Sequence, residues 1–99
     1  MRNVNIESKD KEYKLQLFVS GASPNSVKAI ANFKTICEEY ISGRYDLEII
    51  DIYQQPLMAK QEQLIALPLL IKLYPLPVRR LIGDMSDKQK VLKGLGLEN

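Results

Sequence analysis

The chain contains no histidine, no tryptophan and only one cysteine, Cys37. Histidine is the commonest general base near neutral pH and the commonest zinc ligand, so its absence removes both from the chemistry of this chain. A single cysteine cannot form an internal disulfide, which fits a reducing compartment and predicts a cytoplasmic protein. Asp84 and Asp87 are a weak indication of a metal site because no further ligands accompany them. Gly94 and Gly96 do not form a nucleotide-binding loop, since no strand pattern leads into them. We expect no metal and no cofactor.

Long apolar runs are also missing. The longest candidate, 64–74, is interrupted by Pro68 and Lys72, and it is shorter than the roughly 18–20 residues needed to cross a membrane. Residues 1–12 are polar and of mixed charge, without the apolar centre of a secretory signal. A chain of 99 residues is long enough for one core and too short for two. We therefore expect a flexible leader over 1–12, a single domain over 13–99 and no insertion into membranes.

Charge of one sign does not dominate. Fourteen lysines and arginines against twelve aspartates and glutamates give a net charge of +2, whereas a protein that binds nucleic acid through phosphates carries clustered, dominant positive charge. Arg79 and Arg80 form the only adjacent basic pair. The sequence thus favours a protein partner over a nucleic acid.

The first half predicts a β-α-β unit. Apolar residues alternate over 13–20, which is typical of a strand with one strongly buried side, and Phe18 suggests that the other side is partly covered as well. Ser23 is suited to cap a helix and Pro24 to open it. The helix should bury one face and end at Gly43; that face comprises Val27, Ile30, Phe33, Cys37 and Ile41. A second strand over 47–53 should lie parallel to the first, with a right-handed crossover.

The second half is harder to interpret. Local patterns predict a short helix over 56–65, strands over 69–74 and 78–82, and a last helix that starts with a capping box at Ser86 and closes at Gly94. This order, α-β-β-α, completes a thioredoxin-like α/β fold. Three prolines fall within ten residues, and the apolar run 64–74 has no clean period. A second packing of this half is therefore physically conceivable.

Thioredoxin-like proteins carry two reactive cysteines where this chain has Ser23 and Ser26. A serine nucleophile needs a base, and without histidine a helix cap is the favoured interpretation of this pair. Cys37 is either a redox sensor or, as its place on the apolar face favours, a buried and inert thiol. Pro68 is either a cis proline facing a groove or a residue that breaks a strand edge.

Several segments, in the same order, resemble the KaiB family of small clock proteins that act on the hexameric ATPase KaiC. The matching segments are Leu17-Phe18-Val19-Ser20-Gly21, Ser23-Pro24-Asn25-Ser26, Leu67-Pro68-Leu69-Leu70, Pro75-Leu76-Pro77-Val78-Arg79-Arg80-Leu81-Ile82-Gly83-Asp84 and Lys90-Val91-Leu92-Lys93-Gly94-Leu95. The resemblance extends from Tyr13 to Leu97, and the long run that starts at Pro75 is distinctive. It also favours the cis form of Pro68.

The resemblance implies a metamorphic second half. One form orders the whole chain as β-α-β-β-α-α-β and assembles as a tetramer; the other is a thioredoxin-like monomer with the order β-α-β-α-β-β-α. The monomeric form is expected to bind a KaiC-like ATPase, to compete there with a histidine kinase and to have no catalytic activity of its own. In the ground state the chain is expected to be a homo-oligomer, either a dimer or a tetramer. Two alternatives remain: a thioredoxin-like enzyme that uses glutathione, and a stress-response adaptor with another partner.

By position, the resemblance also assigns residues to roles. The contact with the ATPase is assigned to Lys72, Arg79 and Arg80. The balance between the two forms is assigned to Tyr13, Pro68, Pro75, Pro77, Gly94 and Gly96. The chain departs from the cyanobacterial pattern at Gly96, where that pattern has aspartate, and in its tail, where Glu98 is nearly all that remains of an acidic segment. These departures suggest a non-cyanobacterial member, for which a KaiA partner is not assumed.

Overall fold

A computed structural model describes residues 11–61 and 66–97 of the chain. Seven elements follow one another: β1 (Tyr13–Val19), α2 (Pro24–Tyr40), β2 (Tyr45–Asp51), α3 (Pro56–Gln61), β3 (Leu69–Tyr74), β4 (Arg79–Ile82) and α4 (Lys88–Leu95). This order, β-α-β-α-β-β-α, is the thioredoxin-like alternative predicted from the sequence. None of the helices in these two segments is long and apolar enough to cross a membrane.

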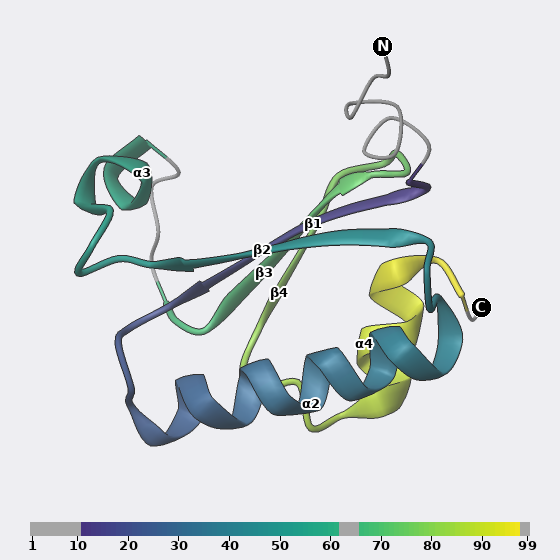
Figure 1. The fold of residues 1–99 in the computed structure, drawn as a ribbon, viewed down its shortest axis with the longest axis horizontal. Helices are drawn as coiled ribbons and strands as arrows, with labels where there is room; N and C mark the ends of the chain where they lie inside the picture. Colours follow the sequence, from purple (N-terminus) through teal and green to yellow (C-terminus); the bar gives the residue numbers. More distant parts are fainter. Residues whose placement is uncertain (1–10, 62–65, 98–99) are drawn as a thin grey trace, which may run out of the picture.

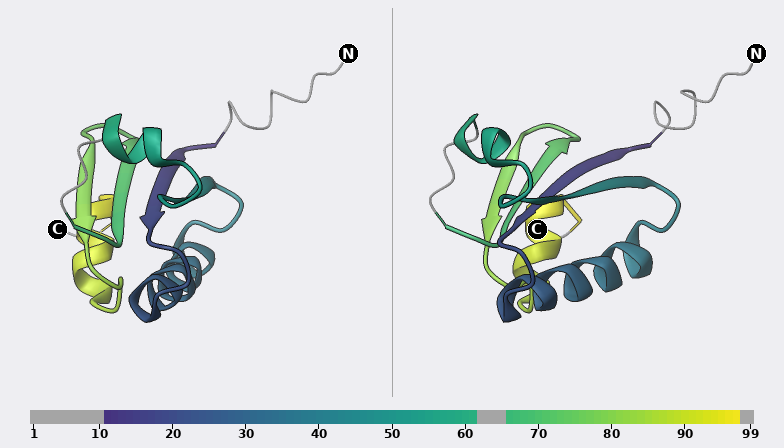
Figure 2. Two further views of the ribbon diagram at one scale, coloured as in Figure 1. Left: turned by 90° about the vertical axis from the view of Figure 1, so that its left-hand side faces the viewer. Right: turned by 60° about the vertical axis from the view of Figure 1, so that its left-hand side comes forward.

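The four strands form one sheet in the order β2-β1-β3-β4. β1 and β2 run parallel, as expected of a β-α-β unit, and they start together because Tyr13 pairs with Tyr45. β3 runs antiparallel to β1, and β4 runs antiparallel to β3. α2 and α4 lie on one face of the sheet and α3 lies on the other (Figures 1 and 2).

The larger core lies between the sheet and the helices α2 and α4. β1 contributes every second residue to it, namely Tyr13, Leu15, Leu17 and Val19. The alternation predicted for this strand is confirmed. On the opposite face, Phe18 is completely buried with Ile50, Leu69 and Ile71, and Met58 of α3 packs against them. The prediction that Phe18 has a covered side is confirmed too.

The buried face of α2 includes Phe33, Cys37 and Ile41, as predicted, but it differs from the prediction near the start of the helix. Val27 is 55% exposed, although it was assigned to the apolar face. Phe33 is fully buried, and counting from it in steps of three and four residues leads to Ala29, Ser26, Ile36 and Cys37, all of which are buried. Val27 lies about a third of a turn away from that stripe. A small residue, Ala29, rather than Val27 therefore allows the helix to approach the sheet.

The boundaries of α4 are also shifted from the predicted ones. Its N-cap is Asp87 and not Ser86, because the Asp87 carboxylate accepts a hydrogen bond from the Lys90 amide. The helix ends at Gly96 and not at Gly94, since Gly96 adopts a left-handed conformation with φ of 81°. Gly94 lies within the helix, where a Cβ atom would come within 2.6 Å of the Leu81 side chain. Gly94 thus permits close contact of α4 with β4.

Other boundaries differ by a few residues. β2 begins at Tyr45 rather than at residue 47, and the predicted continuation of α3 over 62–65 lies outside the described residues. Of the predicted leader, residues 1–10 also lie outside them. The Glu12 carboxylate, in contrast, forms a 2.8 Å ion pair with Arg44, and the Glu12 amide donates to the Arg44 carbonyl. These contacts attach the entry of β1 to the start of β2.

The left-handed cap leads to a prediction about Gly96. A side chain at positive φ is strained, so we expect Gly96→Asp, which restores the cyanobacterial residue, to lower the free energy of unfolding of this fold by about 1 kcal/mol. Gly96→Asn is the control, because asparagine tolerates this conformation better and should cost less. Urea unfolding of the three proteins measures the difference. Equal stability of all three would contradict the role of this cap.

Candidate partner-binding surface

The position of the thioredoxin cysteines holds a closed network of hydroxyl groups. The Ser23 hydroxyl accepts from the Ser26 amide at 3.3 Å and donates to the Ser26 hydroxyl at 2.8 Å. Ser26 is completely buried and accepts from the Ser20 amide at 3.0 Å. Both hydroxyls therefore hold the start of α2, which confirms the predicted helix cap. Thiol chemistry has no reacting group here.

The only cysteine of the chain, Cys37, is also poorly placed for redox chemistry. Cys37 is completely buried on the inner face of α2. Burial, together with the charge of the adjacent Glu38, raises the pKa of its thiol to about 12. The predicted burial of Cys37 is confirmed. A protonated, inaccessible thiol is a poor nucleophile.

We expect Cys37 to react slowly with thiol reagents in the folded protein. At pH 8 the thiolate fraction should fall roughly a thousandfold below that of an ordinary cysteine, even before burial limits access. The rate of reaction with dithionitrobenzoate, measured with and without guanidinium chloride, tests this expectation. Similar rates in the two conditions would show that the thiol is accessible in the native state.

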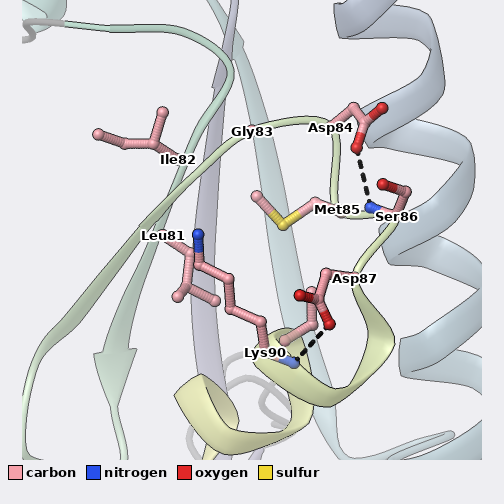
Figure 3. A pocket seen from close by; sticks show the side chains of 9 residues that line it. Leu81, Ile82, Gly83, Asp84, Met85, Ser86, Asp87 and Lys90 are labelled. Carbon is pink, nitrogen blue, oxygen red and sulfur yellow. Dashed lines mark hydrogen bonds between the residues drawn. The ribbon is translucent and has the colours of Figure 1, made fainter.

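The two aspartates considered as metal ligands have structural roles. They line a cavity of about 190 Å³ between the end of β4 and the start of α4 (Figure 3). The Asp84 carboxylate accepts a hydrogen bond from the Ser86 amide at 3.0 Å, while Asp87 caps α4. Hydrogen bonds lower the pKa of Asp84. Among the described residues no three side chains of the metal-binding types come together.

The residues assigned to the balance between forms lie at structural junctions. Tyr13 is buried at the start of β1 in the same core cluster as Leu92 and Leu95 of α4, and the Arg44 guanidinium lies 5.8 Å from its ring centre. Gly94 and Gly96 shape α4, as described above. Pro68, Pro75 and Pro77 each follow a cis peptide bond, so the cis form predicted for Pro68 is confirmed.

The three residues assigned to the contact with the ATPase differ in exposure. Arg79 and Arg80 are exposed on β4. Lys72 is only 4% exposed, and its ammonium group donates to the Pro75 carbonyl at 2.7 Å. Its charge is thus directed into the turn of the β3–β4 hairpin instead of the solvent. Lys72 holds the turn that precedes the arginine pair.

Lys72 offers a test with a defined dependence on pH. Burial, and next the charge of Arg79, lower its pKa from the usual 10.5. The folded state therefore loses the Lys72 proton at a lower pH than the unfolded state does. Between the lowered pKa and 10.5 the unfolded state binds more protons, so the free energy of unfolding rises with pH. We expect the free energy of unfolding of the wild type, relative to Lys72→Met, to increase between neutral pH and pH 10.5. A difference that stays constant would show that Lys72 titrates normally.

Exposed apolar side chains precede the arginine pair in the chain. Tyr74, Leu76 and Val78 are 54%, 67% and 52% exposed, respectively. Together with Arg79 and Arg80 they form the hairpin surface, at the end of the sheet where β3 turns into β4 (Figure 2). Sequence analysis did not identify the three apolar members. The available signal was the Pro75-Leu76-Pro77 run, because proline cannot extend a strand ladder and leaves its neighbours outside the sheet.

An exposed cluster of this kind is typical of a surface that binds another protein. Isolated apolar residues are common on protein surfaces, but contiguous ones beside paired arginines mark interaction sites. The fold defines the class of the protein: a thioredoxin-like domain without the two redox cysteines.

Solved structures agree with this class at the level of the fold. The N-terminal domain of SasA from Synechococcus elongatus superimposes with a TM-score of 0.69 at 24% identity, over 90% of this chain and 88% of that domain. Chloroplastic thioredoxin z gives a TM-score of 0.70 at 17% identity, over 94% of this chain and 85% of the other. At such identities the likeness concerns the fold alone.

Sequence comparison identifies the family. The KaiB domain model matches residues 16–97. The circadian clock oscillator protein KaiB of Synechococcus elongatus is 48% identical over 88% of this chain and 85% of its own length, and KaiB of Gloeothece citriformis is 47% identical over 88% and 82%. The chain belongs to the KaiB family.

Proposed function

We propose that this protein is a non-catalytic regulator that binds a KaiC-like hexameric ATPase as a thioredoxin-like monomer and modulates its ATPase and phosphorylation cycle. The observation that carries the proposal is the arrangement of the second half, α3-β3-β4-α4, in a chain of the KaiB family. That order is the one implied for the binding-competent form. The hydrogen-bonded serines at the former redox position support a binding role rather than a thiol-dependent one.

The proposal includes a second form of the same chain, in which the last forty or so residues pack differently and copies associate into a homo-oligomer. A partner that binds one form only shifts the population towards it, provided that the two forms differ by about a few kcal/mol. To reach that form, α4 would have to separate from α2, and β3 from β1. A histidine kinase that uses the same site on the ATPase would be displaced; a KaiA-like partner is not part of the proposal.

Co-elution from a size-exclusion column tests the binding step. The protein is incubated for hours with the cognate KaiC-like ATPase, in parallel with ATP and with ADP, and we expect it to appear in the fraction of the hexamer with at least one nucleotide. Carbon chemical shifts of Leu69–Tyr74 and Ser86–Leu92 then show which packing the free protein adopts. Absence of co-elution with either nucleotide would overturn the proposal.

A further inference from the structure

The short connection between β4 and α4, residues 83–87, contains a strained backbone and is called the joint below. Within the described residues, Met85 is the only residue other than glycine with a positive φ, and its φ is 63°. For a residue with a Cβ atom this conformation is unfavourable, because the Cβ atom comes close to the carbonyl oxygen that follows it. Such a conformation persists only where the surrounding structure enforces it. The contacts of the joint therefore have to hold Met85 in place.

The joint is held partly by its own residues. The Met85 side chain is 5% exposed and belongs to the larger core, and Figure 3 shows it extending towards β4. The Ser86 amide donates a hydrogen bond to the Asp84 carboxylate at 3.0 Å. These contacts fix the turn once the joint lies against the sheet, but they do not connect its backbone to α2.

Further polar contacts reach the joint and the residue after it from α2. The Asn32 side-chain amide donates to the Asp84 carbonyl at 2.9 Å, in a partly buried position. The Lys88 ammonium lies 3.2 Å from the Glu39 carboxylate and 5.1 Å from the centre of the Tyr40 ring. The Lys88 and Glu39 side chains are 46% and 52% exposed, so their ion pair contributes little. Of these contacts, the Asn32 hydrogen bond is therefore the main polar link between α2 and the joint.

Packing around the joint is incomplete. The cavity of about 190 Å³ described above lies on its β4 side. A second space, of about 260 Å³, lies between α2 and the joint, and its lining includes Asn32, Ile36, Met85 and Ser86. A segment with few close apolar neighbours opens more easily than a close-packed one. The joint thus combines a strained backbone with room to move.

We infer that the joint is a strained link whose release allows α4 to leave the sheet, and that Asn32 is the positioning residue that holds it closed. α2 keeps its place in the β-α-β unit in both proposed forms, so the Asn32–Asp84 bond exists only while the second half packs as described. When that bond opens, Met85 can return to an ordinary backbone conformation, and the loss of strain favours the open state. The inference deepens the proposed function and rests on it for what α4 does after release. Opening of the joint is a property of the free protein.

Amide hydrogen exchange of the free protein, followed by NMR, measures this opening. The amides of Val91 and Leu97 are hydrogen-bonded near the two ends of α4, and a helix of this length does not persist once it has left the sheet. Both amides should exchange at least about tenfold faster than that of Leu17 in β1, which waits for global unfolding. Asn32→Ala should speed their exchange a further fivefold or so, because one hydrogen bond is lost. The matched control, Asn25→Ala, removes the same atoms at an exposed position of α2 and should leave it unchanged.

Substitution of Met85 tests the strain separately. Met85→Ala and Met85→Gly both remove the buried thioether, but only alanine keeps a Cβ atom at the positive φ. We therefore expect the glycine variant to be the more stable one, with a folding equilibrium constant about fivefold higher in urea unfolding. Lys34 provides the matched control, because it is exposed within α2. Lys34→Ala should be more stable than Lys34→Gly, since alanine is favoured in a helix.

Each outcome decides a separate point. Exchange of the two α4 amides as slow as that of Leu17 would overturn the release of α4 as a separate event. Equal rates in Asn32→Ala and Asn25→Ala would overturn the role of Asn32. An alanine variant of Met85 at least as stable as the glycine variant would overturn the strain; if neither variant folds, the exchange experiment decides alone. Failed co-elution with the ATPase, together with the expected exchange rates, would overturn the proposed function and leave the joint intact.

Discussion

Replacement of Leu92 by alanine should release α4 from the sheet. Leu92 is 2% exposed and packs in the main core together with Val91 and Leu95. A leucine truncated at such a site costs about 2–5 kcal/mol. This cost is as large as the few kcal/mol that separate two packings of one chain in a fold-switching protein. We therefore expect Leu92→Ala to abolish co-elution with the ATPase and to change the carbon chemical shifts of Ser86–Leu92.

The matched control is Leu57→Ala, which removes the same atoms from α3. Leu57 is 73% exposed, so its replacement should change stability by less than about 0.5 kcal/mol. It should also leave co-elution intact. If the two variants behaved alike, docking of α4 would not be what maintains the binding-competent form.

Reversal of the arginine pair should have the largest effect on partner binding. Arg79 and Arg80 are exposed beside the apolar turn of the hairpin. If they face acidic groups of the partner, Arg79→Glu/Arg80→Glu converts attraction into repulsion, and like charges across an interface cost several kcal/mol. We expect the affinity for the ATPase to fall at least about a hundredfold. Titration of the ATPase against labelled protein measures the change.

Two controls accompany this variant. Lys28→Glu/Lys34→Glu makes the same change in net charge on α2 and should have little effect, because only long-range attraction is altered. Arg79→Gln/Arg80→Gln should lie between the wild type and the reversed variant. An equal loss in the α2 variant would mean that overall charge, and not the hairpin surface, governs the interaction.

Periodicity in the sequence was sufficient for the first half of the fold. Alternation along β1 and the Ser23-Pro24 start of α2 are local signals, and both are confirmed. Of the predicted buried face of α2, Phe33, Cys37 and Ile41 are confirmed and Val27 is wrong. Hydrophobicity favoured Val27, whereas the small residues Ser26 and Ala29 are buried instead. Which side chains face each other is decided only in the assembled core, so the sequence pattern alone does not show where a small residue is needed.

In the second half, the boundaries of the elements and the burial of single side chains depended on more than the local sequence pattern. The order of its elements was predicted, yet the ends of α4 were not, because Ser86 and Asp87 both suit a cap and only the Asp84–Ser86 turn decides between them. Lys72 is a similar case. A lysine near the end of a strand is expected to be solvated, and only the position of the Pro75 carbonyl explains why it is buried. The apolar part of the hairpin surface is different, because the Pro75-Leu76-Pro77 run was a local signal for it.

The position of β1 limits how the chain can rearrange. It pairs with β2 on one side and with β3 on the other, and its residues Leu15, Leu17, Phe18 and Val19 are at most 2% exposed. If β3 separated from β1, one edge of this buried apolar strand would be exposed, with a row of unsatisfied amides and carbonyls. Such a state invites any strand that is near, including one from another copy. The second form proposed above would therefore need a replacement neighbour for β1, so its population should increase with protein concentration.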